Sequence, residues 1–178
     1  MEICAVVMAA GKSTRMKSKI SKVAHQVSGK PIIQWVADAL FEAGCSEQVY
    51  VVGEQQEQIR SILGENVIYV LQEEQRGTGH AVMQASGFLE GRLGVTIVLP
   101  GDCPMVSADT IKRALAAYEA EGDDCAAMII TAVADDPTGY GRVLRDSDGS
   151  VDRIIEHRDC TEEELKIKEI NSSMYVFR

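Results

Sequence analysis

Apolar runs alternate with amphipathic segments along the first two thirds of the chain. Short, nearly continuous apolar runs are typical of buried strands, whereas apolar positions spaced by three and four residues indicate helices. Strands are predicted over residues 3–8, 48–52, 67–71 and 95–99. Helices are predicted over residues 31–43, 55–63, 79–88 and 107–121, with Pro31 in a first turn and Thr78 and Ser107 as N-caps. This alternation predicts parallel strands, right-handed crossovers and ligands at the carboxyl ends of the strands.

The pattern changes after Cys125, where strands follow one another more closely. They are predicted over residues 126–134, 141–145, 151–156 and 170–177, with a short helix over 161–165 and a hairpin turn at Asp148-Gly149. The chain is therefore predicted to be one α/β domain over residues 1–178. We expect a Rossmann-like mixed, mainly parallel sheet flanked by helices, with a small β-hairpin insertion. The 178 residues, 46% of them hydrophobic, are enough to bury a core.

The loop after the first predicted strand is a candidate anion site. The strand ends in small residues and cations: Met8, Ala9, Ala10, Gly11, Lys12, Ser13, Thr14 and Arg15, with Lys22 further along. Small residues let the backbone approach a phosphate closely, and the cations supply charge. The segment is not a P-loop, because that motif needs a glycine where Val6 stands, and no G-x-G-x-x-G dinucleotide motif follows the strand. An ordinary strand-to-helix turn is the alternative.

Charge and cysteine content narrow the possible partners. The formal net charge of −9 argues against nucleic acid or an anionic membrane surface as a partner and favours a small, locally bound anion. The five cysteines are widely spaced without a C-x-x-C pair, which indicates free thiols in a reducing cytoplasm. No apolar run is long enough to span a bilayer, and the Met1-Glu2 start lacks the basic region of a signal peptide. We therefore expect a cytoplasmic protein.

Asp102 is the candidate metal ligand. It lies in the segment Pro100-Gly101-Asp102-Cys103-Pro104, directly after a predicted buried strand. A carboxylate at this end of a parallel strand projects into the ligand crevice, where it can hold Mg²⁺ that bridges nucleotide phosphates. An aspartate that caps the following loop is the alternative.

A second strand end, in the segment LQEEQRGTGHA of residues 71–81, is a candidate base-binding site. Gln72 carries a donor and an acceptor that can read a base edge, while Gly77 and Thr78 offer backbone and hydroxyl contacts. A capped helix with a loop glutamine would explain Thr78 equally well. His80 is interpreted as packing on the helix rather than as a catalyst.

Polar residues also end apolar strands near the end of the chain. Gly141, in Thr138-Gly139-Tyr140-Gly141-Arg142, can allow a close backbone approach to a sugar, or it can simply belong to a tight turn. Glu156 and Asn171 supply a carboxylate and an amide, a natural pair for sugar hydroxyls. Singly, each is equally consistent with a surface position at a strand end.

Taken together, these segments resemble a known family. The motifs AAGKSTRM, SKV around Lys22, QEEQRGTGHA, GDCPMV, DPTGYGRV, IIEHRD and KEIN cover essentially the whole chain. They are similar to the N-terminal uridylyltransferase domain of the bifunctional bacterial N-acetylglucosamine-1-phosphate uridylyltransferase/glucosamine-1-phosphate acetyltransferase. The first and fourth motifs occur across sugar-nucleotide transferases, whereas the combination with QRGTGHA, TGYGR and EIN is far more specific. The resemblance implies the nucleotide-diphospho-sugar transferase fold, with a nucleotide part over residues 1–122 and a sugar part over 123–178.

The resemblance also implies a role for each candidate residue. The nucleotide would be wrapped by Met8, Ala9, Ala10 and Gly11, and its uracil would be held by Gln72, Gly77 and Thr78. Arg15 would bind the outer phosphates, Lys22 the attacked phosphate, and Asp102 the Mg²⁺ ion. N-acetylglucosamine would be held by Gly141, Glu156 and Asn171. The implied reaction transfers UMP from UTP to N-acetylglucosamine 1-phosphate and releases pyrophosphate. It makes UDP-N-acetylglucosamine, a precursor of the peptidoglycan cell wall.

Some features depart from the family pattern. Pro100 stands where the family commonly has a residue such as Tyr, and Ser172-Ser173 stand where Thr-Gly is usual. The sequence given ends before the family's second magnesium ligand, an Asn, and before the acetyltransferase domain through which full-length members trimerise. On that basis we expect a monomer or weak dimer that binds UTP and Mg²⁺ weakly and turns over poorly. The alternatives are another sugar-1-phosphate nucleotidyltransferase, or a nucleotide-binding module with little activity.

Overall fold

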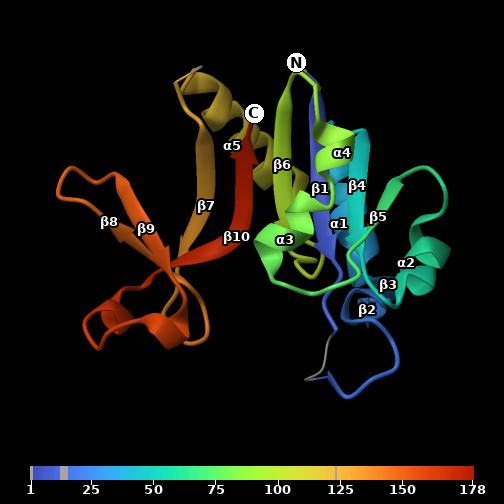
Figure 1. Ribbon diagram of the computed structural model, residues 1–178, viewed down its shortest axis with the longest axis horizontal. Helices are drawn as coiled ribbons and strands as arrows, with labels where there is room; N and C mark the ends of the chain where they lie inside the picture. The colour runs from blue at the N-terminus through green and yellow to red at the C-terminus, as the bar shows by residue number, and fades with distance from the viewer. Residues whose placement is uncertain (1, 13–15, 123) are drawn as a thin grey trace. The chain divides into compact units, whose positions relative to one another are not determined.

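A computed structural model of the chain describes residues 2–12, 16–122 and 124–178. The chain forms two compact units. The first contains Met1–Ala127 together with Val176–Arg178, and the second contains Met128–Tyr175. Figure 1 traces the elements of both.

The first unit is built on a parallel sheet. Its order is β5 (Ile68–Leu71), β4 (Glu47–Val52), β1 (Ile3–Ala9) and β6 (Val95–Pro100). Strand β1 pairs in parallel with both β4 and β6, and Met8 lies opposite Val51 on one side and Pro100 on the other. The carboxyl ends of these strands therefore lie at one edge. The strand order continues with β10 (Glu169–Phe177), whose last residues belong to this unit. The predicted α/β class with a mainly parallel core is confirmed.

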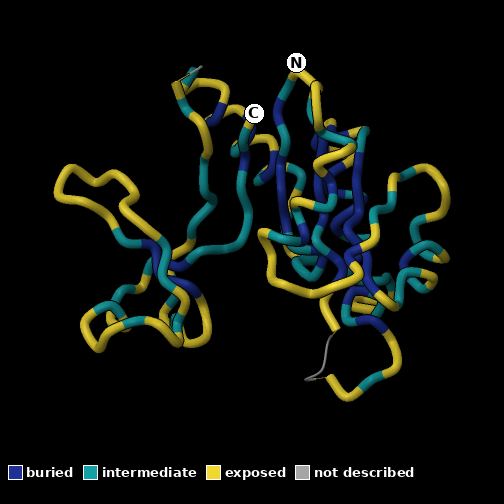
Figure 2. Tube along the Cα trace, viewed as in Figure 1, coloured by how far each residue is buried: buried dark blue, intermediate teal, exposed yellow. Residues whose placement is uncertain are grey.

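The core lies where the pattern of apolar residues predicts it. Ala5, Val6 and Val7 of β1 are fully buried, and so are most residues of β4. Figure 2 shows β1, β4 and β6 mostly as dark, buried traces connected by exposed loops. Burial on both faces is the reason that these strands are continuous apolar runs rather than alternating ones.

Helices connect the strands of the first unit. They are η2 (Lys22–Ala24), α1 (Ile32–Glu42), α2 (Gln56–Leu63), α3 (Thr78–Met83), α4 (Ser86–Leu89) and α5 (Ala108–Ala120), and a small ribbon of β2 (Gln26–Val27) with β3 (Lys30–Pro31) precedes α1. Helix α1 contacts both α2 and α5. Ser107 caps α5 as predicted, because its side chain accepts a hydrogen bond from the Thr110 backbone N–H at 3.2 Å.

The prediction of one helix over residues 79–88 with Thr78 as its cap is wrong. Gly77 occupies the N-cap position with a φ of 106°, so Thr78 is already the first residue of α3. The chain leaves α3 at Gln84 and begins a separate short helix, α4, after Ala85. Glycine adopts the left-handed φ at Gly77 without steric cost, which lets the chain turn one residue earlier than a threonine cap would require.

The second unit is mostly antiparallel. Strands β8 (Arg142–Arg145) and β9 (Val151–Ile155) form the predicted hairpin, and Gly149 in its turn has a φ of 88°. Strand β10 (Glu169–Phe177) pairs antiparallel with β8, and β7 (Ala127–Val133) also pairs with β10. The predicted helix over 161–165 is instead a short 3₁₀ turn, η4 (Glu164–Lys166), which follows a similar turn, η3 (His157–Asp159).

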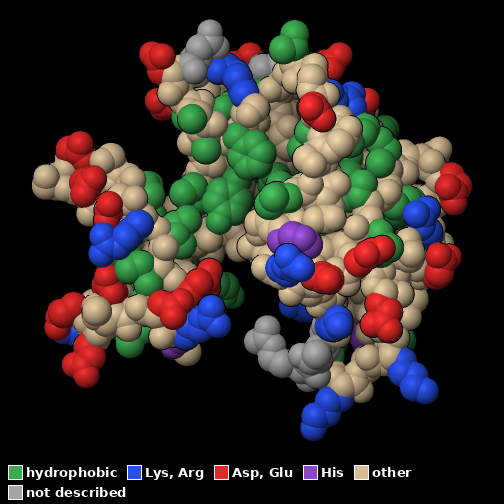
Figure 3. Space-filling model, in the orientation of Figure 1, with side chains coloured by type: hydrophobic (Ala, Val, Ile, Leu, Met, Phe, Trp, Pro, Cys, Tyr) green, Lys and Arg blue, Asp and Glu red, His purple; other side chains and the backbone are tan. Residues whose placement is uncertain are grey.

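The surface carries both signs of charge. On the face shown in Figure 3, acidic and basic side chains are interspersed. Within the part of the chain that the structure describes, no helix combines the length and the apolar character needed to cross a membrane.

Candidate functional site

The carboxyl ends of β1 and β6 place the candidate anion loop beside the candidate metal ligand. Gly101 donates its backbone N–H to the Met8 carbonyl at 2.9 Å, which fixes the turn after β6. A Cβ atom on Gly101 would lie 2.8 Å from Ile33 Cδ1 and 3.2 Å from the Met8 carbonyl, so glycine is needed for this close approach. Asp102 follows directly and is thereby held at the edge of the sheet.

Lys22 and Asp102 contact each other. Lys22 begins η2, and its ammonium group donates a hydrogen bond to Asp102 Oδ2 in an ion pair. The two side chains are 45% and 31% exposed, so a ligand can reach the pair from solvent. Although 80 residues separate them in the sequence, the fold brings a cation and a carboxylate to one point.

Cys103 adjoins this pair but is not a nucleophile at neutral pH. Its Sγ lies 3.9 Å from Asp102 Oδ1. Burial, reinforced by the neighbouring Asp102 charge, raises the pKa of the Cys103 thiol to about 11. The thiol therefore stays protonated near pH 7, and the thiolate is the nucleophilic form of cysteine.

Two glutamines of the α2 region hold the segment that leads into Lys22. Gln58 Oε1 accepts the Ser21 backbone N–H at 2.8 Å, while Gln58 Nε2 donates to the Lys19 carbonyl at 3.0 Å. Gln55 Nε2 donates to the same carbonyl, also at 3.0 Å. Ser21 is only 2% exposed. The sequence analysis missed both glutamines, because a glutamine on an amphipathic helix carries no signal that separates a backbone contact from simple exposure to water.

Replacing Gln58 with methionine tests this contact. Methionine has a similar volume but can neither donate nor accept the two hydrogen bonds, so the Ser21 N–H is left buried without a partner. We expect the free energy of unfolding to fall by about 1–3 kcal/mol in urea denaturation. Gln56→Met is the matched control. Among the residues that the structure describes, the Gln56 side chain forms one hydrogen bond, accepted from Arg60 Nε at 3.4 Å, and its loss should cost less than about 0.5 kcal/mol. Equal stability of the two variants would contradict the assignment.

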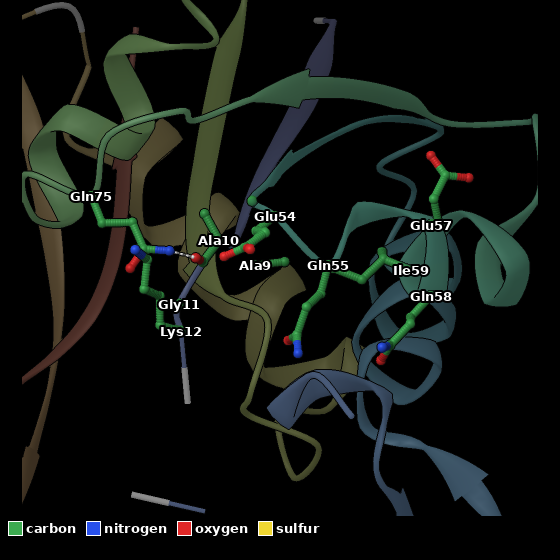
Figure 4. Close-up of a pocket in the computed structure, with 11 residues that line it drawn as sticks. Ala9, Ala10, Gly11, Lys12, Glu54, Gln55, Glu57, Gln58, Ile59 and Gln75 are labelled. Carbon is green, nitrogen blue, oxygen red and sulfur yellow. Dashed lines mark hydrogen bonds between the residues drawn. The ribbon is translucent and has the colours of Figure 1, made fainter. Parts of the chain in front are cut away.

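A cavity of about 520 Å³ opens beside the candidate anion loop. It is lined by Ala9, Ala10, Gly11, Lys12, Gly53, Glu54, Gln55, Glu57, Gln58, Ile59 and Gln75. In Figure 4 the Gln55 and Gln58 side chains extend in the same direction, whereas Glu57 points away from them. Gln75 donates from its side chain to the Ala10 carbonyl, which ties the loop after β5 to the end of β1. The cavity therefore adjoins the predicted nucleotide-binding residues Ala9, Ala10 and Gly11.

The candidate base-binding residues lie after β5, which ends at the same edge as β1 and β4. The Gln72 backbone N–H donates to the Val52 carbonyl at 2.8 Å, and the Gln72 side chain is buried. Its Nε2 atom is 3.4 Å from the Gly77 carbonyl oxygen and 3.0 Å from His80 Nδ1. Gly77 and Thr78 are exposed at the start of α3, and α3 contacts β1.

The second unit brings the predicted sugar-binding residues together. The Asn171 backbone N–H donates to the Gly141 carbonyl at 2.9 Å, and a Cβ atom on Gly141 would lie 3.7 Å from Asn171 Cβ. Arg142 pairs with Ile155, so the exposed Glu156 follows β9 at the point where Gly141 precedes β8. The Asn171 amide is oriented by Tyr175, to which its Nδ2 donates at 2.7 Å.

The serine that stands where the family usually has glycine has an unusual backbone conformation. Ser173 has a φ of 60°, in the left-handed region that glycine prefers. Its backbone N–H donates to Asn171 Oδ1 at 2.9 Å, which holds this conformation within β10. The strand therefore keeps a glycine-like φ here without glycine. The remaining site prediction, Arg15, lies outside the described residues.

The arrangement of the chain is found in solved nucleotidyltransferase structures. It superposes on a Bacillus anthracis protein assigned as a glucose-1-phosphate thymidylyltransferase, in complex with a sucrose, with a TM-score of 0.83, 17% identity and coverage of 98% of this chain and 71% of the other. It also matches a UDP-glucose pyrophosphorylase complexed with UDP-glucose, with a TM-score of 0.77, 18% identity and coverage of 99% and 76%. At these identities the likeness establishes the fold.

Relatives found by sequence have a higher identity to this chain than these two structures do. The chain is 49% identical over 177 residues to the bifunctional protein GlmU of Exiguobacterium sp. strain AT1b, and 50% identical over 173 residues to that of Halalkalibacterium halodurans. These alignments cover 99% and 97% of this chain but 39% and 38% of the relatives, so the chain spans about two fifths of their length.

A family model covers most of the same region. Residues 5–157 match the model described as the MobA-like NTP transferase domain, a range that includes the β1 loop, Lys22, Gln72 and Asp102. The chain therefore belongs to the MobA-like NTP transferase domain family, and it is homologous to the N-terminal part of the bifunctional GlmU proteins.

Proposed function

We propose that this chain transfers UMP from UTP to N-acetylglucosamine 1-phosphate, forming UDP-N-acetylglucosamine and pyrophosphate. Homology to GlmU over nearly the whole chain supports this activity, and so does the motif set that resembles the uridylyltransferase domain. The observation that carries the proposal is the contact between Lys22 and Asp102 at the carboxyl ends of the strands. An ammonium group suited to a phosphate beside a carboxylate suited to a divalent metal supports the proposed chemistry.

The residues present fit Mg²⁺. Asp102 offers a hard carboxylate oxygen on a partly exposed side chain, and proteins bind Mg²⁺ through one or two carboxylates together with substrate phosphates and water. Among the described residues, no group of three or more His, Cys, Asp or Glu side chains is placed to hold a metal ion, so phosphate oxygens and water would complete the coordination. Bound Mg²⁺ would neutralise negative charge on the triphosphate.

The protein itself supplies positioning and charge. The β1 loop, with Met8, Ala9, Ala10 and Gly11, lets the backbone approach the nucleotide, and Lys22 meets the phosphate under attack. Arg15 is assigned to the outer phosphates. Gln72, Gly77 and Thr78 hold the base, and the amino sugar is held by Gly141, Glu156 and Asn171.

The reaction needs no protein nucleophile. An oxygen of the sugar phosphate attacks the α-phosphorus of UTP, a new P–O bond forms, and the bond to the β-phosphate oxygen breaks as pyrophosphate leaves. Positioning of the reactants and neutralisation of their charge lower the barrier for such an in-line displacement. The protonated Cys103 thiol beside Asp102 is consistent with this chemistry.

Thermal shift with nucleotides tests the proposal. UTP with Mg²⁺, at a hundredfold excess over Kd, should stabilise the protein by about 2.7 kcal/mol, and ATP or GTP at the same concentration should stabilise it less. Pyrophosphate release should then depend on added N-acetylglucosamine 1-phosphate. A larger shift with ATP or GTP would overturn the uridine assignment, and pyrophosphate release that is indifferent to the sugar phosphate would overturn the acceptor.

A further inference from the structure

The Gln72 amide sits in a fixed hydrogen-bonding arrangement. Its Nε2 atom lies 3.4 Å from the Gly77 carbonyl oxygen and 3.0 Å from His80 Nδ1. A carbonyl oxygen only accepts hydrogen bonds, so the Gly77 contact requires the NH₂ end of the amide to face this side. Gln72 Oε1 then lies on the other branch of the planar amide. It accepts no hydrogen bond from the residues that the structure describes.

The His80 ring completes this arrangement through its tautomer. With the NH₂ end of Gln72 facing it, Nδ1 must act as an acceptor, so the ring proton resides on Nε2. Gln84 Nε2 lies 3.3 Å from His80 Nε2, but it already donates to the His80 backbone carbonyl at 3.0 Å. The Gln84 amide therefore donates to the backbone carbonyl and does not require the His80 ring as its acceptor. The shorter contact, to Gln72, sets the tautomer.

We propose that His80 is a positioning residue that locks the Gln72 amide so that its oxygen faces the base, and that this selects a pyrimidine with an N–H at ring position 3. The inference rests on the proposed function, because it assigns the base site of the same reaction. Uracil carries a hydrogen on N3 and donates to Gln72 Oε1. Cytosine has an unprotonated N3 at that position, so two acceptors would face each other. His80 thus contributes to the choice of nucleotide without touching it.

The locked amide matters because a free glutamine amide does not discriminate in this way. By rotating through 180° about its last bond, it exchanges donor for acceptor and can satisfy either base. Gln72 is 4% exposed, so the groups that surround it decide which end faces the ligand. Without the acceptor at His80 Nδ1, the 3.4 Å contact to Gly77 would be the one hydrogen bond from the described part of the chain that opposes the rotation.

The test compares dissociation constants for UTP and CTP, each with Mg²⁺, by isothermal titration calorimetry. In the wild-type chain UTP should bind at least about tenfold more tightly than CTP. In His80→Leu the ratio should fall to about threefold or less, because affinity for CTP rises relative to UTP. Adding His80→Leu to Gln72→Met should change the ratio no further, because His80 acts only through Gln72.

Gln84→Met is the matched control, because it removes a neighbour on the far side of the ring and leaves the Gln72 contact intact. Its UTP-to-CTP ratio should match the wild type within about twofold. If His80→Leu still bound UTP and its UTP-to-CTP ratio were unchanged, the role of His80 would be overturned, while the proposed function would stand. A wild-type chain that does not bind UTP would overturn the proposed function and this inference together.

A measurement on the unaltered protein does not depend on whether the variants fold. Long-range ¹H–¹⁵N NMR spectra report which nitrogen of each imidazole carries the proton. The proposal requires the His80 proton on Nε2 and an unprotonated Nδ1. A proton found on Nδ1 would overturn it.

Discussion

Replacing Asp102 with asparagine is expected to weaken binding of UTP in the presence of Mg²⁺ about 100-fold, with little change in the fold. Asparagine keeps the shape of the side chain but loses the negative charge that attracts the metal, and a difference of this size corresponds to about 2.7 kcal/mol. The same change releases Lys22 from its carboxylate partner. In EDTA, therefore, binding of UTP to the variant should be equal to or stronger than binding to the wild type.

The opposite outcomes in Mg²⁺ and in EDTA separate loss of a metal ligand from general damage. Isothermal titration calorimetry under both conditions measures them directly. Asp109→Asn is the control, because Asp109 lies on α5 in an exposed ion pair with Arg113. Surface pairs of this kind contribute little, so this variant should bind as the wild type does. If Asp102→Asn lost the same affinity for UTP with and without Mg²⁺, the assignment of Asp102 as the magnesium ligand would be contradicted.

The second large effect is expected from Gly53→Ala. An added Cβ would lie 2.8 Å from the Ala10 carbonyl oxygen and 3.4 Å from Ala10 Cα, so the backbone of one strand end or the other must move. Overpacking of this kind costs about 1–3 kcal/mol. Movement of Ala10 would also disturb its hydrogen bond from Gln75. We expect both a lower melting temperature and a UTP affinity weakened about tenfold.

Gly87→Ala is the matched control for this substitution. Nothing lies within 4 Å of a Cβ added at Gly87, which is in helix α4, and alanine is favoured over glycine in helices by about 1 kcal/mol. This variant should be at least as stable as the wild type and should bind UTP normally. Thermal melts and titrations of the two variants side by side provide the comparison. If Gly53→Ala matched Gly87→Ala in both melting temperature and UTP affinity, the close approach of Gly53 to Ala10 would matter neither for stability nor for binding.

Local patterns in the sequence were sufficient for most elements of the fold. Continuous apolar runs predict the buried parallel strands, and Asp148-Gly149 predicts the β8–β9 hairpin, because both signals arise from a few neighbouring residues. The break between α3 and α4 was missed. Gly77 takes a left-handed φ at the N-cap and α3 ends at Gln84, a boundary that the pattern of apolar residues over 79–88 does not mark.

The sequence singles out candidate site residues one by one, but it does not reveal how they are arranged. Asp102 and Gln72 each follow an apolar run directly, and that position alone singles them out as candidate ligand-binding residues. It cannot show that Lys22 meets Asp102, that Gln58 holds the segment that leads into Lys22, or that His80 faces the Gln72 amide. The Lys22–Asp102 and Gln58 contacts join residues far apart in the sequence. The contact between His80 and Gln72 depends on the turn at Gly77, which the sequence analysis did not predict.

The exposure of the Lys22–Asp102 ion pair has a consequence for how the site fills. Separating two charges that water already reaches costs only about 0–1 kcal/mol, whereas separating a buried ion pair costs about 3–5 kcal/mol. If the proposed function holds, each charge can therefore exchange its partner at low cost when substrate binds, Lys22 for a phosphate and Asp102 for a cation. Without substrate the two groups neutralise each other, so the pair adds no net charge to this edge of the sheet.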